Sequence, residues 1–208
     1  MNGMVGMTSI IIPNCNGLSL LQDAIAAIRL HTDRHETPYE LIVVDNGSLD
    51  GTCRWCIREG ITCLSLAENK GFQFACNRGL RAAAGDYLLL LNNDVTVSAG
   101  WLPALLHTLN SREDVGMVGP VSNFASGRQQ VPSPFSEMEA RSESMLRVVG
   151  FCLLIKRSLY NRIGELDERF SPSHYCLRAR MHGFHLLMCH DVLVHHQGGA
   201  DIKRSDSG

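Results

Sequence analysis

The chain of 208 residues lacks the roughly 18 to 20 consecutive apolar residues that a membrane-spanning helix requires. Its N-terminus also lacks a basic segment followed by the apolar region of a secretory signal. These absences predict a soluble protein of the cytoplasm, and they leave open a peripheral attachment to the inner face of a membrane.

The chain also lacks an excess of positive charge, because its formal net charge is −2 at pH 7. No global basic field therefore favours nucleic acid, and we expect no nucleic-acid partner. Its eight cysteines lie mostly in apolar or helical patterns rather than in a small loop-rich scaffold. That distribution favours reduced thiols over a disulfide framework.

Two clusters of metal-binding residue types lack the full pattern of a zinc site. Cys53 and Cys56 have the spacing of a redox or zinc site, but they fall on a predicted helix without a second cysteine pair. A thiol pair partly in the core is the favoured interpretation. The histidines near the C-terminus, together with Cys189, match no zinc pattern, and we interpret them as neutral side chains.

What the chain does contain is an alternation of strands and helices, and its 45% hydrophobic content suits one large α/β domain. Apolar runs predict strands at residues 8–12, 39–44, 61–66 and 86–91. Helical spacing predicts helices at 18–31, 73–84 and 101–110, and another that opens at 48–52. The alternation implies right-handed crossovers and a mainly parallel sheet flanked by helices.

Beyond residue 115 the pattern is less regular. Apolar runs predict further strands at 115–120, 148–156 and 192–196, and residues 157–163 look helical. Residues 122–143 are polar and contain Pro and Ser, which predicts a mobile loop able to fold over a ligand.

Three polar loops follow strands of the predicted sheet, at residues 14–16, 45–48 and 92–94. Because the carboxyl ends of parallel strands share one edge of a sheet, we expect these loops to converge. Asp45 is placed to accept a hydrogen bond from a base or a ribose hydroxyl, and Asp94 to hold a metal ion. Asn and Asp also form turns and helix caps, so these residue types alone do not indicate a binding site. The interpretation as a site depends on the expected convergence of the three loops.

Four motifs occur in order, at residues 9–17 (SIIIPNCNG), 42–52 (IVVDNGSLDGT), 68–72 with 77–80 (ENKGF and NRGL), and 90–95 (LLNNDV). Further segments follow at 149–157, 163–170 and 194–196. Together they resemble the large inverting family 2 of GT-A glycosyltransferases, and most strongly its rhamnosyltransferase-like branch. The resemblance implies a GT-A fold with a Rossmann-like nucleotide-binding half and an acceptor-binding half.

The resemblance also implies roles for individual residues. Pro13, Asn14 and Asn16 would border the nucleoside, and Asp45 would bind the uracil or thymine ring. Lys70, Asn77 and Arg78 would contact the nucleotide sugar, where a cation stabilises a diphosphate. The expected substrate-binding set is completed by Asn46, Asn92 and Asn93.

Residues 92–94 occupy the place of the family's Asp-x-Asp motif, but the first member here is Asn92. One carboxylate is therefore missing, which predicts weaker affinity for the Mn²⁺ or Mg²⁺ cofactor that the family implies. Asp94 would be the main metal ligand, helped by His195 or His196 at the end of the last strand. The alternative for this histidine pair is a surface cluster without a ligand role.

The chain departs from the family after Phe170, where relatives carry a short acidic loop with the catalytic base. No Asp or Glu occurs between Phe170 and Arg178. We expect a physical interruption between Pro172 and Ser173, with the base in an omitted loop. The alternative is a true loss of the loop and its base, in which His174 is the one nearby titratable substitute.

These expectations describe one domain, with a nucleotide-sugar-binding half at about residues 7–115 and an acceptor half at about 116–200. Its expected activity is inverting transfer of a sugar from a UDP- or dTDP-sugar to a hydroxyl of a saccharide or lipid-linked acceptor, in cell-surface polysaccharide or glycoconjugate synthesis. One alternative is a catalytically impaired nucleotide-binding relative. Another is a nucleotidyltransferase, which would be expected to carry a Gly-rich N-terminal loop with a basic residue, whereas residues 13–16 read Pro-Asn-Cys-Asn.

Overall fold

The computed structural model describes residues 6–131 and 142–198. Much of the predicted mobile loop, residues 132–141, lies outside these ranges. Within them, no helix combines the length and the apolar character needed to cross a membrane.

The N-terminal half forms the predicted alternation of strands and helices. Its elements are β1 (Thr8–Asn14), α1 (Leu18–His31), β2 (Tyr39–Asn46), α2 (Thr52–Arg58), β3 (Thr62–Leu66), α3 (Phe72–Ala82) and β4 (Tyr87–Leu91). The pairings β3–β2, β2–β1 and β1–β4 are all parallel. Branched and leucine side chains fill both faces of β1, β2 and β4, as is typical of a sheet covered on both sides.

The C-terminal half extends the same sheet with reversed strands. Its elements are β5 (Val95–Thr96), α4 (Trp101–Leu109), β6 (Val115–Ser122), the 3₁₀ helix η1 (Gly127–Gln129), β7 (Ser142–Met145), β8 (Cys152–Lys156), α5 (Arg157–Ile163), α6 (Pro172–Met181) and β9 (His185–His196). Strand β8 is antiparallel to β4 and β6, and β9 is parallel to β6 but antiparallel to β5 and β7. The sheet is therefore parallel in its first half and mixed as a whole, in the order β3-β2-β1-β4-β8-β6-β9-β5.

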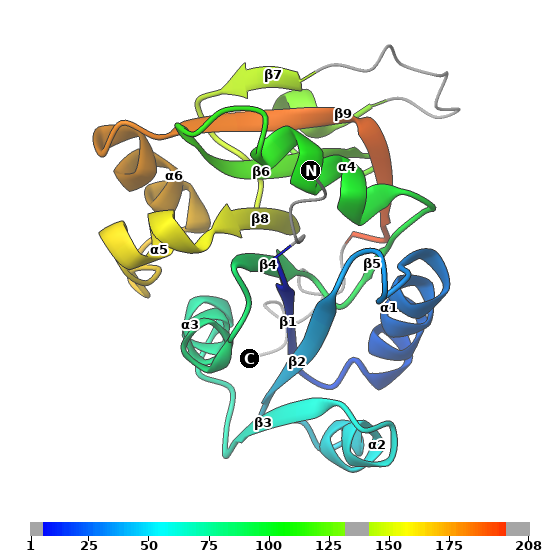
Figure 1. Cartoon of the computed structure of the whole chain (residues 1–208). Coiled ribbons are helices and arrows are strands. Elements are labelled where there is room, and N and C mark those ends of the chain that lie inside the picture. Colours follow the sequence, from blue (N-terminus) through cyan, green and yellow to red (C-terminus); the bar gives the residue numbers. More distant parts are fainter. Residues whose placement is uncertain (1–5, 132–141, 199–208) are drawn as a thin grey trace.

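Helices cover both faces of this sheet (Figure 1). One apolar core lies beneath α1, α2 and α4, and includes Ile25, Trp55 and Trp101. The other lies beneath α3, α5 and α6, and includes Leu80 and Tyr175. The α/β class predicted from the sequence is confirmed.

Several elements differ from the predicted ones; for example, β5 and η1 were not predicted, and β8 begins at Cys152 rather than at residue 148. Strand β7 was not predicted, and β9 begins at His185, well before the expected start at residue 192. Helix α6 begins at Pro172 and continues through Ser173, so the predicted interruption between these two residues is wrong. Proline favours the first turn of a helix, and the His174 N–H donates to Ser171 O at 2.9 Å as that turn closes.

Candidate functional site

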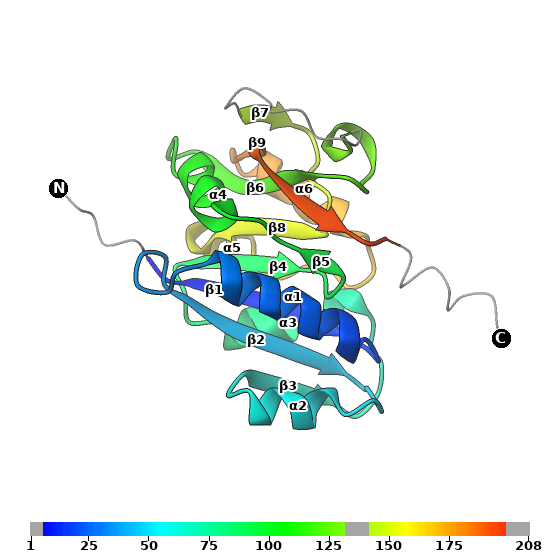
Figure 2. The same ribbon diagram turned by 90° about the vertical axis from the view of Figure 1, so that its right-hand side faces the viewer.

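The ends of β1, β2 and β4 come together through carboxamide side chains. Asn14 pairs in register with Asp45 across β1 and β2. The Asn14 amide donates to Thr52 Oγ1 at 2.9 Å, and its oxygen accepts from the Asn93 amide at 2.6 Å. The predicted convergence of the three polar loops is therefore confirmed at the side of the sheet toward which β2 points (Figure 2).

Asn16 joins the loop after β1 to the loop after β2. It has a φ of 50°, a left-handed conformation that Asn adopts more readily than most residues. Its backbone N–H donates to Ser48 Oγ at 2.8 Å, and its side-chain oxygen accepts from the Leu49 N–H at 2.7 Å. These two bonds fix the course of the chain where it leaves both strands.

Asn46 holds the loop that precedes α3. Its amide donates to Asn69 Oδ1 at 2.8 Å and to Gly71 O at 3.2 Å, while its oxygen accepts from the Lys70 N–H at 2.9 Å. The Lys70 ammonium pairs with Glu68, and both side chains are largely exposed. One buried carboxamide thus positions the whole turn, and Lys70 projects from it at the surface.

A cavity of about 380 Å³ opens between these loops. Its lining is rich in carboxamides and backbone groups and contains one aromatic ring. The lining residues are Pro13, Asn14, Cys15, Asn16, Gly17, Leu20, Asn46, Asn69, Gly71, Phe72, Asn92 and Asn93. Six predicted substrate-binding residues are therefore gathered in one place, namely Pro13, Asn14, Asn16, Asn46, Asn92 and Asn93.

Asp45 lies at the end of β2 but is not among the residues lining this cavity. Its side chain is 3% exposed, and Oδ1 accepts from the Ser48 N–H at 3.2 Å. Such a contact is typical of an Asp that forms a turn, which was the alternative interpretation of Asp45. The expected contact of Asp45 with a base stays a prediction.

Asn77 is placed away from the cavity and is committed to the fold. It is 1% exposed, and its amide donates to Leu166 O at 2.9 Å and to Glu168 Oε1 at 3.2 Å. Its oxygen accepts from the Leu166 N–H at 3.0 Å. Both donors of the carboxamide are used, so the expected sugar contact would require these bonds to break, whereas the neighbouring Arg78 is exposed on α3.

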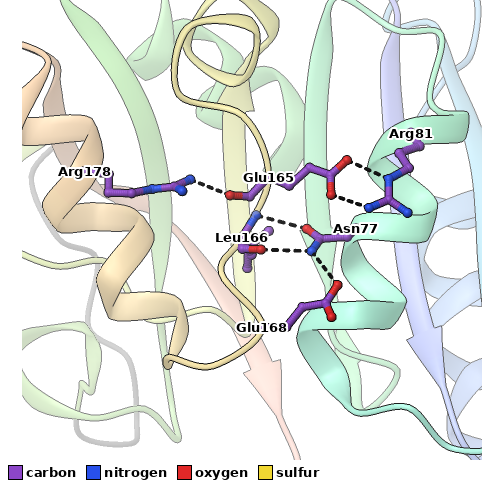
Figure 3. Close-up of polar contacts among 6 residues, drawn as sticks. All are labelled: Asn77, Arg81, Glu165, Leu166, Glu168 and Arg178. Carbon is purple, nitrogen blue, oxygen red and sulfur yellow. Dashed lines mark hydrogen bonds and ion pairs between the residues drawn. The ribbon is translucent and has the colours of Figure 1, made fainter.

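The contacts of Asn77 belong to a wider network that fastens the loop between α5 and α6 (Figure 3). The Arg81 guanidinium makes a two-pronged ion pair with the Glu165 carboxylate, and this hydrogen bond raises the pKa of Arg81. From the other side, Arg178 on α6 donates to Glu165 O. Side chains of α3 and α6 therefore hold the loop between α5 and α6 from two sides.

Asp94 and His196 face each other beside the cavity. Asp94 is 6% exposed, and its Oδ1 lies 3.2 Å from His196 Nε2 but receives no hydrogen bond of good geometry. The other ring nitrogen, Nδ1, lies 2.9 Å from Phe124 O, which can act only as an acceptor. The carbonyl contact places a ring proton on Nδ1, so Nε2 is the ring nitrogen that faces the Asp94 carboxylate. A proton or a metal cation could lie between His196 Nε2 and Asp94 Oδ1.

The structure separates the two predicted histidines. Neighbouring residues of a strand point to opposite faces, so His196 meets Asp94 while His195 is exposed. His195 pairs in register with Thr96, and His196 with Val95. Of the two histidines predicted as alternatives, His196 therefore faces Asp94, and His195 lies exposed at the surface.

The donor set for a divalent cation is small. Among residues 6–131 and 142–198, no three side chains of His, Cys, Asp and Glu are grouped to hold a metal ion. Asp94 and His196 supply two ligand atoms, and Asn92 Oδ1 is a further buried oxygen without a hydrogen-bond partner. Carboxylate, imidazole and amide oxygen are a set that suits Mn²⁺, provided that a bound ligand supplies the remaining coordination.

A second cavity of about 340 Å³ adjoins the first and shares Phe72 and Asn92 with it. It is formed by the segment before β8, the N-terminus of α6 and the end of β9. The lining residues are Phe72, Asn92, Ser126, Arg147, Val148, Val149, Gly150, Phe151, Pro172, Ser173 and His196. Within the described ranges this lining contains no Asp or Glu, and helix α6 stands where the sequence led us to expect an acidic loop.

A mixed sheet with a parallel first half, covered by helices on both faces (Figure 1), is an α/β fold of the GT-A type. Residues 9–164 match the model of glycosyl transferase family 2. The chain belongs to this family, which confirms the resemblance seen in its motifs.

Known relatives agree with the assignment. The chain is 28% identical over 191 residues to the N-acetylglucosaminyl-diphospho-decaprenol L-rhamnosyltransferase of Mycobacterium tuberculosis strain H37Rv, covering 72% of this chain and 61% of the relative. It also matches protein y4gI of Sinorhizobium fredii, with 27% identity over 97% of this chain but only 25% of the relative. The chain thus spans less than two thirds of the length of these relatives.

Solved structures share the fold. The mannosyltransferase PcManGT from Pyrobaculum calidifontis, in complex with GDP-Man and Mn²⁺, superposes with a TM-score of 0.75 at 22% identity, over 94% of this chain and 58% of that one. TarS of S. aureus in complex with UDP-GlcNAc superposes with a TM-score of 0.70 at 16% identity, over 96% of this chain and 61% of that one. At these identities the likeness establishes the GT-A fold.

Proposed function

We propose that this domain binds a nucleoside diphosphate sugar together with a divalent cation, and transfers the sugar to an acceptor hydroxyl with inversion. The observation that carries the proposal is the carboxamide-lined cavity beside the Asp94–His196 pair. The family assignment supports transfer as the chemistry. We propose UDP or dTDP as the nucleotide, because Asp45 lies at the end of the cavity-forming strand β2 and is of the residue type that binds a pyrimidine ring N–H.

The donor would lie across the ends of β1, β2 and β4. Asn14, Asn16 and Asn46 are already fixed by hydrogen bonds to their neighbours, so a nucleoside would meet a site that needs little rearrangement. Exposed Lys70 and Arg78 are within the same region of the chain and can supply positive charge to a diphosphate.

The residues present fit a Mn²⁺ or Mg²⁺ ion. Asp94 Oδ1 and His196 Nε2 would hold it, and the orphaned Asn92 oxygen is a candidate third ligand. When bound, such an ion neutralises negative charge on a leaving diphosphate. The backbone oxygen of Asp94 accepts from the Gln197 N–H at 3.0 Å, and this bond holds the end of β9, which carries His196, next to Asp94.

The acceptor would enter the second cavity, which adjoins the first at Phe72 and Asn92. We propose that residues from about 7 to 115 bind the donor and those from about 116 to 200 bind the acceptor. Val148, Val149 and Phe151 offer an apolar surface and Arg147 a cation, which suits a saccharide or lipid-linked acceptor. Such an acceptor would place the domain at the inner face of a membrane and in glycoconjugate or polysaccharide synthesis.

A second candidate function is nucleotide-sugar binding without efficient transfer. The observation that favours it is the lining of the second cavity, in which the described residues include no carboxylate to deprotonate an acceptor. Helix α6 is continuous from Pro172, so no separate acidic loop is inserted there. Loss of a general base typically costs about 10²- to 10⁴-fold in rate, which leaves binding intact.

Calorimetric titration with UDP, dTDP and GDP, with and without Mn²⁺, tests the common part of both candidates. We expect a nucleoside diphosphate to bind and Mn²⁺ to strengthen the binding. Absence of binding by all three would overturn the proposal. A transfer assay with sugar nucleotides and lipid-linked acceptors then separates the two candidates, because only the first predicts glycosylated product at a rate well above donor hydrolysis.

A further inference from the structure

Three cysteines lie together where α2 packs on β3. Cys53 and Cys56 are one turn apart on α2, and Cys63 lies on β3. The Cys63 thiol donates to Cys53 Sγ over 3.1 Å, which is about 1 Å longer than a disulfide bond. No disulfide joins any of the eight cysteines, all of which lie in the described ranges.

Accessibility distinguishes the three thiols. Cys53 and Cys63 are half-buried, while Cys56 is fully buried against the core. A small reagent can therefore reach Cys53 and Cys63 but not Cys56. Because the described residues contain no metal-binding group of three such side chains, the cluster is not assigned to a metal.

The surroundings of Cys53 and Cys63 disfavour their thiolate forms, whereas the hydrogen bond with Cys63 lowers the pKa of Cys56. The hydrogen bond that Cys53 shares with Cys63, together with burial and the nearby Asp45 charge, raises the pKa of Cys53 to about 11. The pKa of Cys63 is also raised, by its hydrogen bond to Cys56 and by burial. Thiolate is the reactive form, so reaction at this site is favoured by alkaline pH.

The cluster adjoins the cavity described above. Cys53 directly follows Thr52, whose hydroxyl accepts the amide of Asn14 at 2.9 Å. On the other side, Ser65 of β3 pairs in register with Asp45 of β2. A covalent link between α2 and β3 would therefore constrain two elements that hold Asn14 and Asp45.

We propose that Cys53 and Cys63 form a redox site, in which a reversible disulfide ties α2 to β3 beside the cavity. The oxidant is a small-molecule disulfide. One cysteine thiolate attacks it, forming a mixed disulfide and releasing one thiolate, which takes up a proton. The second cysteine thiolate attacks the protein sulfur of that mixed disulfide and releases the second small thiol. Two protein thiols are oxidised and one small disulfide is reduced to two thiols.

The test is exposure of the intact chain to oxidised glutathione, followed by thiol titration under denaturing conditions and peptide mapping. We expect the Cys53 and Cys63 thiols to be lost together into a Cys53–Cys63 linked peptide, and both to be recovered with a dithiol reductant. The rate should rise about tenfold per pH unit near neutral pH, as the thiolate fraction grows. Mixed disulfides alone, or a link through Cys56, would overturn the assignment.

Single substitutions sharpen the test. Cys53→Ser and Cys63→Ser should each abolish the intramolecular link and leave a glutathione adduct on the remaining cysteine. Cys56→Ser removes the buried neighbour and should retain the link. If Cys56→Ser abolishes the link while its thermal unfolding temperature is unchanged, the reacting pair is misidentified.

The effect on the cavity rests on the proposed function and needs a separate measurement. The disulfide draws the first turn of α2 toward β3, away from the Asn14 contact, so the oxidised protein should bind UDP severalfold more weakly than the reduced protein. Cys53→Ser should bind UDP equally well before and after oxidation. A mapped disulfide with unchanged UDP affinity would overturn the link to the cavity, whereas a chain that binds no nucleotide in either state would instead count against the proposed function.

Discussion

The two halves of the sheet differ in how their polar side chains are held. In the first half, Asn14, Asn16 and Asn46 each bond to a neighbouring loop, and all three line one cavity. In the second half, the adjoining cavity is lined mainly by apolar groups, with His196 and Arg147 as its charged or titratable members. The first cavity is therefore prearranged by hydrogen-bonded carboxamides, whereas the described lining of the second cavity contains no carboxylate that could remove a proton.

The largest effect is expected where the two halves meet, at Asp94. Replacing Asp94 with Asn removes the carboxylate that faces His196, so Mn²⁺-dependent binding of a nucleoside diphosphate should fall at least about 100-fold. Calorimetry in the presence and absence of Mn²⁺ measures this.

His195→Gln is the matched control for Asp94→Asn, because His195 is the exposed neighbour of His196 on β9. It should change affinity less than about twofold, in line with other surface substitutions. Equal losses in the two variants would mean that the Asp94–His196 pair has no special role.

The next effect concerns the bridge between the halves. Asn77→Ala leaves the backbone groups of Leu166 without their partners, and each buried polar group left unsatisfied costs about 1 to 3 kcal/mol. We expect the free energy of unfolding to fall by about 2 to 4 kcal/mol in urea titrations. The exposed neighbour provides the control, since Arg78→Ala should change stability by less than about 0.5 kcal/mol. A neutral Asn77→Ala would show that α3 does not hold the loop between α5 and α6.

A smaller effect is expected within the carboxamide-lined cavity. Asn46→Ala releases the turn at residues 69–71 without removing a charge, so nucleotide affinity should fall about tenfold, the equivalent of roughly 1.4 kcal/mol. Asn46→Asp keeps the acceptor for the Lys70 N–H but loses the donors to Asn69 and Gly71. It should give an intermediate loss. If both variants bind as tightly as the parent chain, the turn is not part of the binding surface.

The same comparison explains what could be predicted from the sequence. Parallel strands bring their carboxyl ends together, so the position of Asn14, Asp45 and Asn93 near one another follows from strand order alone. The position of Asn77 does not, because its partners Leu166 and Glu168 lie about 90 residues away in a loop without regular spacing. Whether His195 or His196 faces Asp94 depends on which face of β9 each side chain occupies. That is set by how β9 pairs with β5 and does not follow from the sequence.

Helix α6 and strand β7 were missed for related reasons. The sequence Ser-Pro-Ser at residues 171–173 is typical of a turn. Because no acidic residue follows it, we expected a chain interruption between Pro172 and Ser173. Proline instead serves as the first residue of the helix. Strand β7, with the sequence SESM, has little apolar pattern of its own, and it is held by antiparallel pairing with β9. Tertiary pairing overrides weak local preference in such a segment.

The smallest effect is expected at Asp50, which joins the starts of helices α1 and α2 in the first half of the sheet. Its Oδ2 accepts from the Leu18 N–H at 2.9 Å, and its Oδ1 accepts from the Thr52 N–H at 3.1 Å. Partial burial alone would raise the pKa of Asp50, but these bonds and that of the Thr52 hydroxyl lower it overall. A carboxyl whose pKa is lower in the folded state stabilises the fold above its unfolded pKa of about 3.9, and this contribution is lost as pH falls through the folded value. Asp50→Asn should therefore cost about 1 kcal/mol at pH 7 and progressively less below about pH 4, as urea titrations across this range would show. Because Asp50 is exposed, solvent screening keeps the effect small. A loss that is the same at pH 7 and pH 3 would mean that the Asp50 charge does not stabilise the two helix starts.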